Sequence, residues 1–163
     1  MLVGCSNTIS NKNGKSFYNI PPTLLLYTNN ISISYVPNII LWNDSISTSV
    51  YTFKDLINTV PISYIPINET INFNFLDSTP DKIIISDLIL NDTGTNMYSD
   101  KETIYSCLTL DNNIFKYALP ENQASLFNSQ SQENRFDIRG ITAKVFWGTN
   151  ECEYIFLIKT DPL

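Results

Sequence analysis

The sequence contains no histidine, and this absence excludes more chemistry than any motif in the chain establishes. Without histidine the protein has no Ser-His-Asp or Cys-His nucleophile pair and no histidine-bearing zinc site. It also lacks the side chain best suited to acid–base catalysis near neutral pH. Carboxylates are therefore the remaining candidates for acid–base chemistry.

Glycine, basic runs and long apolar stretches are also scarce or absent. Five scattered glycines build no phosphate-binding loop. Ten basic against sixteen acidic residues give a net charge of −6, and no run of Lys or Arg occurs, which excludes the basic stripe of a nucleic-acid-binding protein. The acidic balance also disfavours electrostatic attachment to anionic lipid. No apolar stretch reaches the ~18 residues of a membrane-spanning helix.

The residues that are abundant favour β-structure. Isoleucine and asparagine together make up about a quarter of the chain, while the helix formers alanine and arginine are few. Isoleucine, tyrosine and phenylalanine favour strands, and asparagine favours turns. A chain of 163 residues with 43% hydrophobic residues is long enough for one domain with its own core.

Apolar residues alternate with polar ones in short runs separated by turn residues, as at residues 31–35 and 71–75. The clearest hairpin joins residues 138–147 to residues 151–160, and we expect Pro37 and Asn38 to end the strand at 31–35. Residues 50–60 have the spacing of one short helical turn. The pattern predicts an all-β, immunoglobulin-like antiparallel β-sandwich of about 7–9 strands with at most one helical turn.

The N-terminus carries a lipobox-like motif, Leu2-Val3-Gly4-Cys5. In bacterial lipoproteins a diacylglyceryl group is attached to the cysteine thiol, and small residues before it admit the signal peptidase. The basic and apolar regions that normally precede a lipobox are missing. Truncation, a misassigned start codon or a chance match would each explain this, and a chance match would make Cys5 an ordinary free or buried cysteine.

Polar, unpatterned residues follow Cys5 and are typical of a flexible tether. We therefore divide the chain into a truncated signal remnant, lipobox and tether at residues 1–19, and a β-sandwich domain at residues 20–163. The predicted location is extracytoplasmic, at the cell membrane, with a lipid on Cys5 as the anchor.

The two other cysteines, Cys107 and Cys152, lie in strand-like runs. On an oxidising cell surface they could form a disulfide, which would stabilise the fold by about 4 kcal/mol in the chain-entropy model. The alternative is two buried thiols that act as small apolar side chains.

The carboxylates are candidates for catalysis, but their positions favour structural roles. Glu151 and Glu153 point to the same side of the last strand, where we expect a solvated outer face, although such a pair could in principle serve glycoside hydrolysis. Asp87 ends an apolar strand, and we expect it to mark the point where that strand reaches solvent. The remaining candidates lie in predicted turns: Asp77, Asp81, Asp92 and Asp111. No calcium-loop spacing occurs, so we predict no catalytic residue, metal or cofactor.

The aromatic residues could either form a ligand platform or fill the core. The set consists of Trp42, Tyr64, Tyr105, Trp147 and Tyr154. A buried Trp between two sheets is expected in a sandwich, so we place both tryptophans in the core. Two connections, residues 91–102 and 120–134, are then the best candidates for ligand contact.

Four short motifs resemble a group of uncharacterised small surface lipoproteins of Gram-positive Bacillota. They are Pro-Pro-Thr-Leu at residues 21–24, Leu-Trp-Asn at 41–43, Pro-Asp-Lys-Ile at 80–83, and a Trp-Gly turn with an aromatic-rich last strand at 147–156. The resemblance implies an exported immunoglobulin-like domain and brings no established activity.

The sequence therefore favours a cell-surface lipoprotein whose β-sandwich is a non-catalytic binding module. Its ligand would be a protein, a peptide or a cell-wall component, and its membrane contact would be the lipid on Cys5. One alternative is an accessory or sensor lipoprotein of a membrane complex, and another is a carboxylate-based hydrolase.

Overall fold

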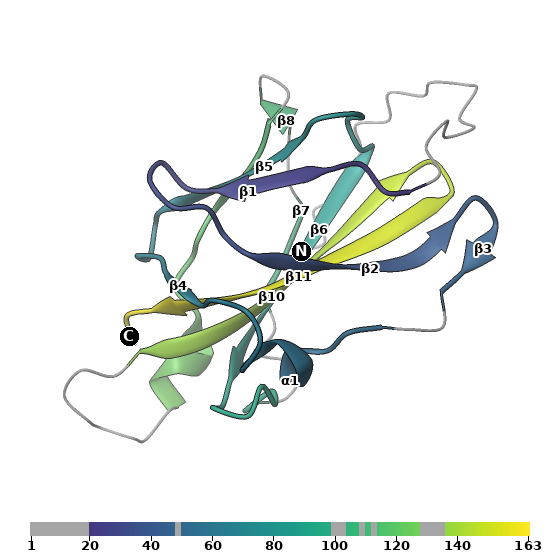
Figure 1. The fold of residues 1–163 in the computed structure, drawn as a ribbon. Coiled ribbons are helices and arrows are strands. Elements are labelled where there is room, and N and C mark those ends of the chain that lie inside the picture. The colour runs from purple at the N-terminus through teal and green to yellow at the C-terminus, as the bar shows by residue number, and fades with distance from the viewer. Residues whose placement is uncertain (1–19, 48–49, 99–103, 108–109, 112–113, 128–135) are drawn as a thin grey trace, which may run out of the picture.

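The computed structural model confirms the predicted all-β antiparallel sandwich: two sheets lie face to face (Figure 1). It describes residues 20–47, 50–98, 104–107, 110–111, 114–127 and 136–163, with the backbone alone at 104–107 and 110–111. The lipobox, Cys5 and the predicted tether lie outside the described residues.

The smaller sheet has four antiparallel strands. Their order is β1 (Leu24–Tyr27), β5 (Thr70–Phe75), β9 (Ile114–Ala118) and β8 (Leu110–Asp111). The predicted alternation at residues 71–75 is confirmed, because Ile71, Phe73 and Phe75 are all buried.

The larger sheet is built around the closing hairpin. Its order is β3 (Ser45–Ile46), β2 (Tyr35–Trp42), β11 (Asn150–Thr160), β10 (Asp137–Trp147), β6 (Lys82–Leu90) and β7 (Ile104–Cys107), with β4 (Ser63–Tyr64) pairing in parallel with β11. Strands β10 and β11 pair along their whole length and meet at a two-residue turn, in which Gly148 has a φ of 59°. The hairpin predicted from the sequence is thus confirmed, with Asn150 in the strand instead of the turn.

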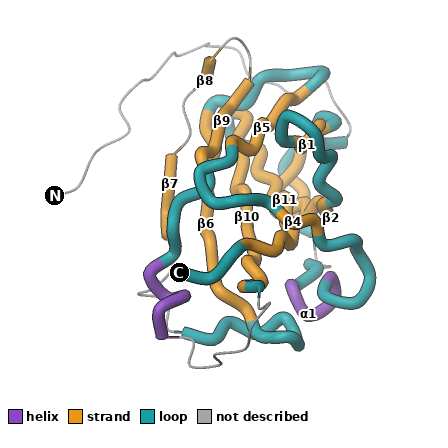
Figure 2. Tube along the Cα trace, turned by 90° about the vertical axis from the view of Figure 1, so that its left-hand side faces the viewer, coloured by secondary structure: helices purple, strands orange, loops and turns teal. Residues whose placement is uncertain are grey.

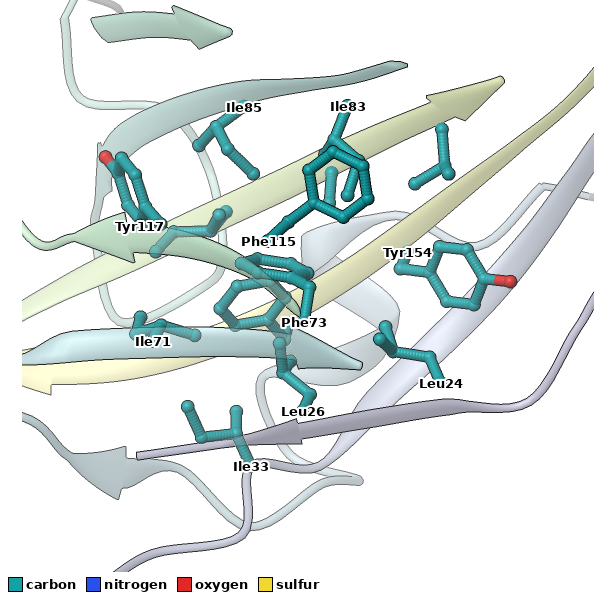
Figure 3. Packing of buried hydrophobic residues seen from close by; sticks show 14 of the residues in the cluster. Leu24, Leu26, Ile33, Ile71, Phe73, Ile83, Ile85, Phe115, Tyr117 and Tyr154 are labelled. Carbon is teal, nitrogen blue, oxygen red and sulfur yellow. The ribbon is translucent and has the colours of Figure 1, made fainter. Parts of the chain in front are cut away.

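The inward faces of the two sheets form one hydrophobic core (Figure 3). Leucine, isoleucine and phenylalanine of β1, β5 and β9 meet the apolar residues of β6, β10 and β11. The ring of Phe73 lies 6.1 Å from that of Phe156, joining the two sheets at the centre of the core. At about 25 cal/mol per Å² of buried apolar area, this core is the main source of stability.

Strand β2 differs from the prediction, because it runs straight through Pro37. Of residues 31–35, Ser32 makes an isolated bridge with Tyr27 and Tyr35 begins β2. Pro37 lies opposite Tyr154 of β11, and among the described residues β3 covers the other side of β2 only at Leu41 and Trp42. Proline is tolerated there because an edge position needs no backbone donor.

A short helix, α1 (Phe53–Leu56), covers part of the outer face of the larger sheet (Figure 1). This matches the predicted helical turn, and Leu56 packs with Leu90, Ile155 and Leu157 in a second apolar cluster. Thr52 is the N-cap of this helix, and Asp55 completes a capping box with it. The Asp55 carboxylate accepts hydrogen bonds from the amide and the hydroxyl of Thr52, both at 2.7 Å. These bonds lower the pKa of Asp55, the hydroxyl contributing most.

Gly140 of β10 makes room for this helix. A Cβ at that position would lie 2.6 Å from Leu90 Cδ1 and 3.0 Å from the Phe53 ring. Glycine weakens a strand, so its presence here is explained by the close approach of α1.

We predict that Gly140→Val destabilises the protein by about 1–3 kcal/mol, because the new side chain overlaps Leu90 and Phe53. Urea unfolding monitored by tryptophan fluorescence measures the loss. The control is Thr142→Val, two residues along the same face of β10. Equal unfolding free energies for the two variants would contradict the proposed contact.

Candidate functional site

Asp87 is fully buried, so the expectation that it marks where β6 reaches solvent is wrong. It follows Ile83 and Ile85 on the inward face of the strand. Its carboxylate accepts hydrogen bonds from Arg139, through Nη2 and through Nε at 3.0 Å, and from the Tyr117 hydroxyl at 2.9 Å. Burying a carboxylate costs much free energy unless it is paired and hydrogen-bonded, as Asp87 is here.

Arg139, on the inward face of β10, is the partner that the sequence analysis did not identify. It is fully buried and forms an ion pair with Asp87 through Nη2. Its third donor, Nη1, donates to the Pro120 carbonyl at 2.7 Å. One guanidinium thus ties β10, β6 and the segment that follows β9 to each other.

Tyr117 of β9 extends this cluster to the smaller sheet. Burial raises the pKa of its phenol, and the adjacent Asp87 charge raises it further. The phenol therefore stays protonated at ordinary pH and remains a hydrogen-bond donor to Asp87. Both sheets consequently hold the same buried carboxylate.

A second polar connection lies at the same end of the sandwich. The 3-10 helix Gln123–Phe127, inside the predicted polar loop, places the Ser125 hydroxyl where it donates to the carboxylate of Asp137. The same hydroxyl accepts a hydrogen bond from the Leu163 amide at 2.9 Å. Figure 2 shows this helix beside the C-terminal end of the chain.

Asn122 begins this helix and orders its first turn. Its side-chain oxygen accepts from the Ala124 amide at 3.1 Å, and its carbonyl accepts from the Ser125 amide at 2.9 Å. Its side-chain nitrogen is buried without a partner among the described residues. Residues 119–127 are therefore held by three anchors: Pro120 on Arg139, Asn122 at the helix start, and Ser125 on Asp137.

Large apolar side chains are exposed around this anchored segment. We call this group the apolar rim: Tyr64, Leu126, Phe136 and Leu163, exposed by 39%, 61%, 47% and 42%. The rings of Tyr64 and Phe136 are 5.4 Å apart, and the Leu163 amide binds the residue next to Leu126. Phe136 immediately precedes β10, and Leu126 lies in the 3-10 helix Gln123–Phe127, so the rim surrounds the start of β10 and this helix.

Glu151 and Glu153 lie on the outer face of the larger sheet, as expected. Lys144 forms a 2.7 Å ion pair with Glu151 and lies opposite Glu153 in the pairing of β10 with β11. Partial burial raises the pKa of Glu153, and the charge of Lys144 opposes this shift. Glu151 and Glu153 are therefore surface carboxylates whose negative charge is partly balanced by Lys144.

Two of the other four acidic candidates bind backbone amides. Asp81 accepts a hydrogen bond from the Gly148 amide at 2.6 Å, and Asp77 accepts one from the Thr23 amide at 3.3 Å. Asp92 is exposed in a turn, and the side chain of Asp111 lies outside the described residues. Within the described part of the chain, no three His, Cys, Asp or Glu side chains are placed to hold a metal ion.

The candidate aromatic platform divides between core and surface. Trp42 and Trp147 are buried, as expected, and stack edge-to-face at 5.5 Å. Tyr154 is also buried, and its hydroxyl donates to the Pro22 carbonyl at 3.1 Å. Tyr64 alone of the set is exposed among the described side chains, and that of Tyr105 lies outside them.

The suggested Cys107–Cys152 disulfide is not formed, because Cys152 is a free, buried thiol. Two strands, β10 and β6, separate β11 from β7. Three strand spacings of ~4.8 Å put the two backbones about 14 Å apart, well beyond the ~7 Å limit for a disulfide. Burial raises the pKa of the Cys152 thiol to about 12.

The connection at residues 91–102 begins with a packed turn. The Asn91 side chain accepts hydrogen bonds from the amides of Thr93 at 3.0 Å and Thr95 at 2.9 Å. Gly94 has a φ of 77° and packs closely against the backbone of Phe53. This part of the connection therefore supports α1, and residues 99–102 lie outside the described part.

The sequence contained a signal for the buried cluster. In the predicted strand at 138–147, Arg139 alternates in phase with Ile141, Ala143 and Val145, which places it on the core side. A charged residue on a core face implies a buried partner. The identity of that partner, Asp87, depends on strand order, which alternation does not determine.

Comparison with protein-family models, curated proteins and solved structures finds no match for this chain. In the described residues, no helix is long and apolar enough to cross a membrane.

We predict that Arg139→Met and Asp87→Asn each destabilise the protein by about 3–5 kcal/mol, because each leaves a buried group without its partner. The double variant should lose clearly less than the sum, since the two residues interact directly. Urea unfolding of all four proteins measures this coupling. The control cycle is Lys144→Met with Glu151→Gln, a partly exposed pair expected to couple by about 0–1 kcal/mol. Additive losses at Asp87 and Arg139 would contradict the assignment.

We also predict that Cys152 is unreactive in the native protein. Burial and its raised pKa leave little thiolate at pH 8, so a Cys5→Ser/Cys107→Ser variant should show no thiol reactive toward an aromatic disulfide reagent. One thiol should appear in guanidinium chloride. A Cys107–Cys152 peptide in a non-reduced digest of the unmodified chain would show that the free-thiol assignment is wrong.

Proposed function

We propose that this chain is a cell-surface binding module that recognises a protein partner through the apolar rim. The lipid on Cys5 and the tether at residues 6–19 would hold the sandwich at the outer side of the membrane. The lipobox-like motif at residues 2–5 and the resemblance to small Bacillota lipoproteins support this location.

The observation that carries the proposal is the exposure of four large apolar side chains at one anchored end of the sandwich. Large apolar side chains exposed together at one end of a protein mark an interaction site more often than single scattered ones do. Exposed apolar residues bind most tightly when the backbone beneath them is already ordered, because little conformational entropy is lost on binding.

The anchors supply that order. Arg139 holds Pro120, and Asp137 holds the Ser125 hydroxyl, which in turn holds the Leu163 amide. Each bond is buried or partly buried, so water competes weakly for it. Leu126 and Leu163 are thereby presented from a backbone fixed to the centre of the larger sheet.

The charge of the module is consistent with this class of partner. A net charge of −6 disfavours polyanionic ligands such as nucleic acids and anionic polymers. An apolar contact with a protein does not require a basic surface on this chain.

The experiment replaces Leu126 and Leu163 by serine in the full chain and measures retention of partners captured by photo-crosslinking on intact cells. Each substitution removes apolar contact area, and together we expect them to weaken binding by tenfold or more, the range of an interface hot spot. The lipid anchor is left intact in every variant.

The matched control is Ile46→Ser with Leu76→Ser, exposed by 78% and 57% at the opposite end of the sandwich. Thermal unfolding verifies that all variants are folded. Unchanged partner capture by the rim variant, or equal loss in the control, would refute the rim as the binding surface.

A further inference from the structure

Two exposed aromatic rings at the apolar rim form an open corner. Tyr64 belongs to β4, which lies beside the C-terminal end of the chain (Figure 1), and Phe136 immediately precedes β10. Their ring centroids are 5.4 Å apart and their planes meet at 64°. Because the side chains are 39% and 47% exposed, the corner faces solvent.

A carboxylate adds negative charge to this corner. The Tyr64 hydroxyl donates a 2.6 Å hydrogen bond to the Asp161 carboxylate, and Asp161 is exposed. This hydrogen bond is the main reason that the pKa of Tyr64 is raised. The phenol therefore stays protonated at ordinary pH, and its hydrogen bond to the carboxylate makes the ring richer in electrons.

Among the described residues, no basic side chain forms an ion pair or a cation–π contact with Tyr64, Phe136 or Asp161. Lys159 lies opposite Tyr64 in the parallel pairing of β11 with β4 and is half-buried. In the described part of the chain, the cation–π contact is that of Lys144 over Phe146, at the other end of β10. The buried charge of Arg139 is neutralised by Asp87.

We propose that Tyr64, Phe136 and Asp161 bind an arginine side chain of the partner protein, an inference that rests on the function proposed above. A planar guanidinium stacks on an aromatic face and also donates two hydrogen bonds to a carboxylate. Leu126 and Leu163 would contact apolar residues beside that arginine. The two rings of Tyr64 and Phe136 do not enclose a quaternary ammonium ion, which favours an arginine side chain over a free organic cation.

The test uses the full chain and a defined probe, the peptide acetyl-Leu-Ala-Arg-Ala-Leu-amide, at up to about 10 mM to reach weak affinities. The comparison peptide carries citrulline, which is planar but uncharged, in place of arginine. Nuclear magnetic resonance titration should show shifts at residues 64, 136 and 161, with at least fivefold weaker binding of the citrulline peptide. Tetramethylammonium chloride should bind more weakly than the arginine peptide.

Variants separate the parts of the corner. Asp161→Asn and Phe136→Leu should each weaken arginine-peptide binding severalfold, and Tyr64→Phe should do so while keeping the ring. Tyr51→Leu is the control, since Tyr51 is 54% exposed outside the corner. Equal binding of the two peptides, no binding of either, or unchanged binding by Asp161→Asn and Phe136→Leu would overturn the inference.

These outcomes are distinct from those for the rim itself. If the citrulline peptide binds as well as the arginine peptide, the corner does not select a cation. Partner capture by the variant with serine at Leu126 and Leu163 still tests the proposed function. If the rim variants keep their partners while the arginine peptide binds the corner selectively, the proposed rim is wrong and the corner stands as a separate site.

Discussion

The guanidinium of Arg139 and the carboxylate of Asp87 meet inside the sandwich, where burying either charge without the other would strongly destabilise the fold. Because Tyr117 comes from the opposite sheet and Pro120 from the segment after β9, this pair also fixes how the two sheets and that segment lie relative to each other. A core of aliphatic side chains alone would pack the sheets together, but it would specify their alignment less strictly. The hydrogen-bonding geometry of one guanidinium supplies that restriction.

The buried pair links the core to the proposed binding surface. Strand β10 carries Arg139 on its inward face, begins at Asp137 and is preceded by the exposed Phe136. Its partner β11 ends beside the exposed Leu163, whose amide is bound to the 3-10 helix. Exposed apolar and aromatic groups are therefore displayed from the ends of the two most extensively paired strands in the molecule. A binding surface of this kind loses little entropy when it meets its partner.

Where sequence patterns depend on neighbours along the chain, they predicted the structure well. The alternation at residues 71–75, the hairpin around Gly148 and the helical turn after Thr52 are all present, because each is set by contacts within a few residues. The expectations for Pro37 and Asp87 were wrong for one shared reason. Both treated a residue by its usual preference, whereas an edge position accommodates the proline and a distant arginine accommodates the aspartate.

Composition and periodicity by themselves determined that this chain is an antiparallel β-sandwich without histidine chemistry, with both tryptophans inside and Glu151 and Glu153 outside. Tertiary structure alone decided which strands are neighbours. That order separates Cys107 from Cys152, joins Arg139 to Asp87, and brings Tyr64 to Phe136 and Asp161 across 72 and 97 residues of sequence. Alternation tells which face of a strand a residue occupies, but pairing between strands depends on the packing of the whole core. The site is assembled from such pairings, so it becomes visible only in the folded molecule.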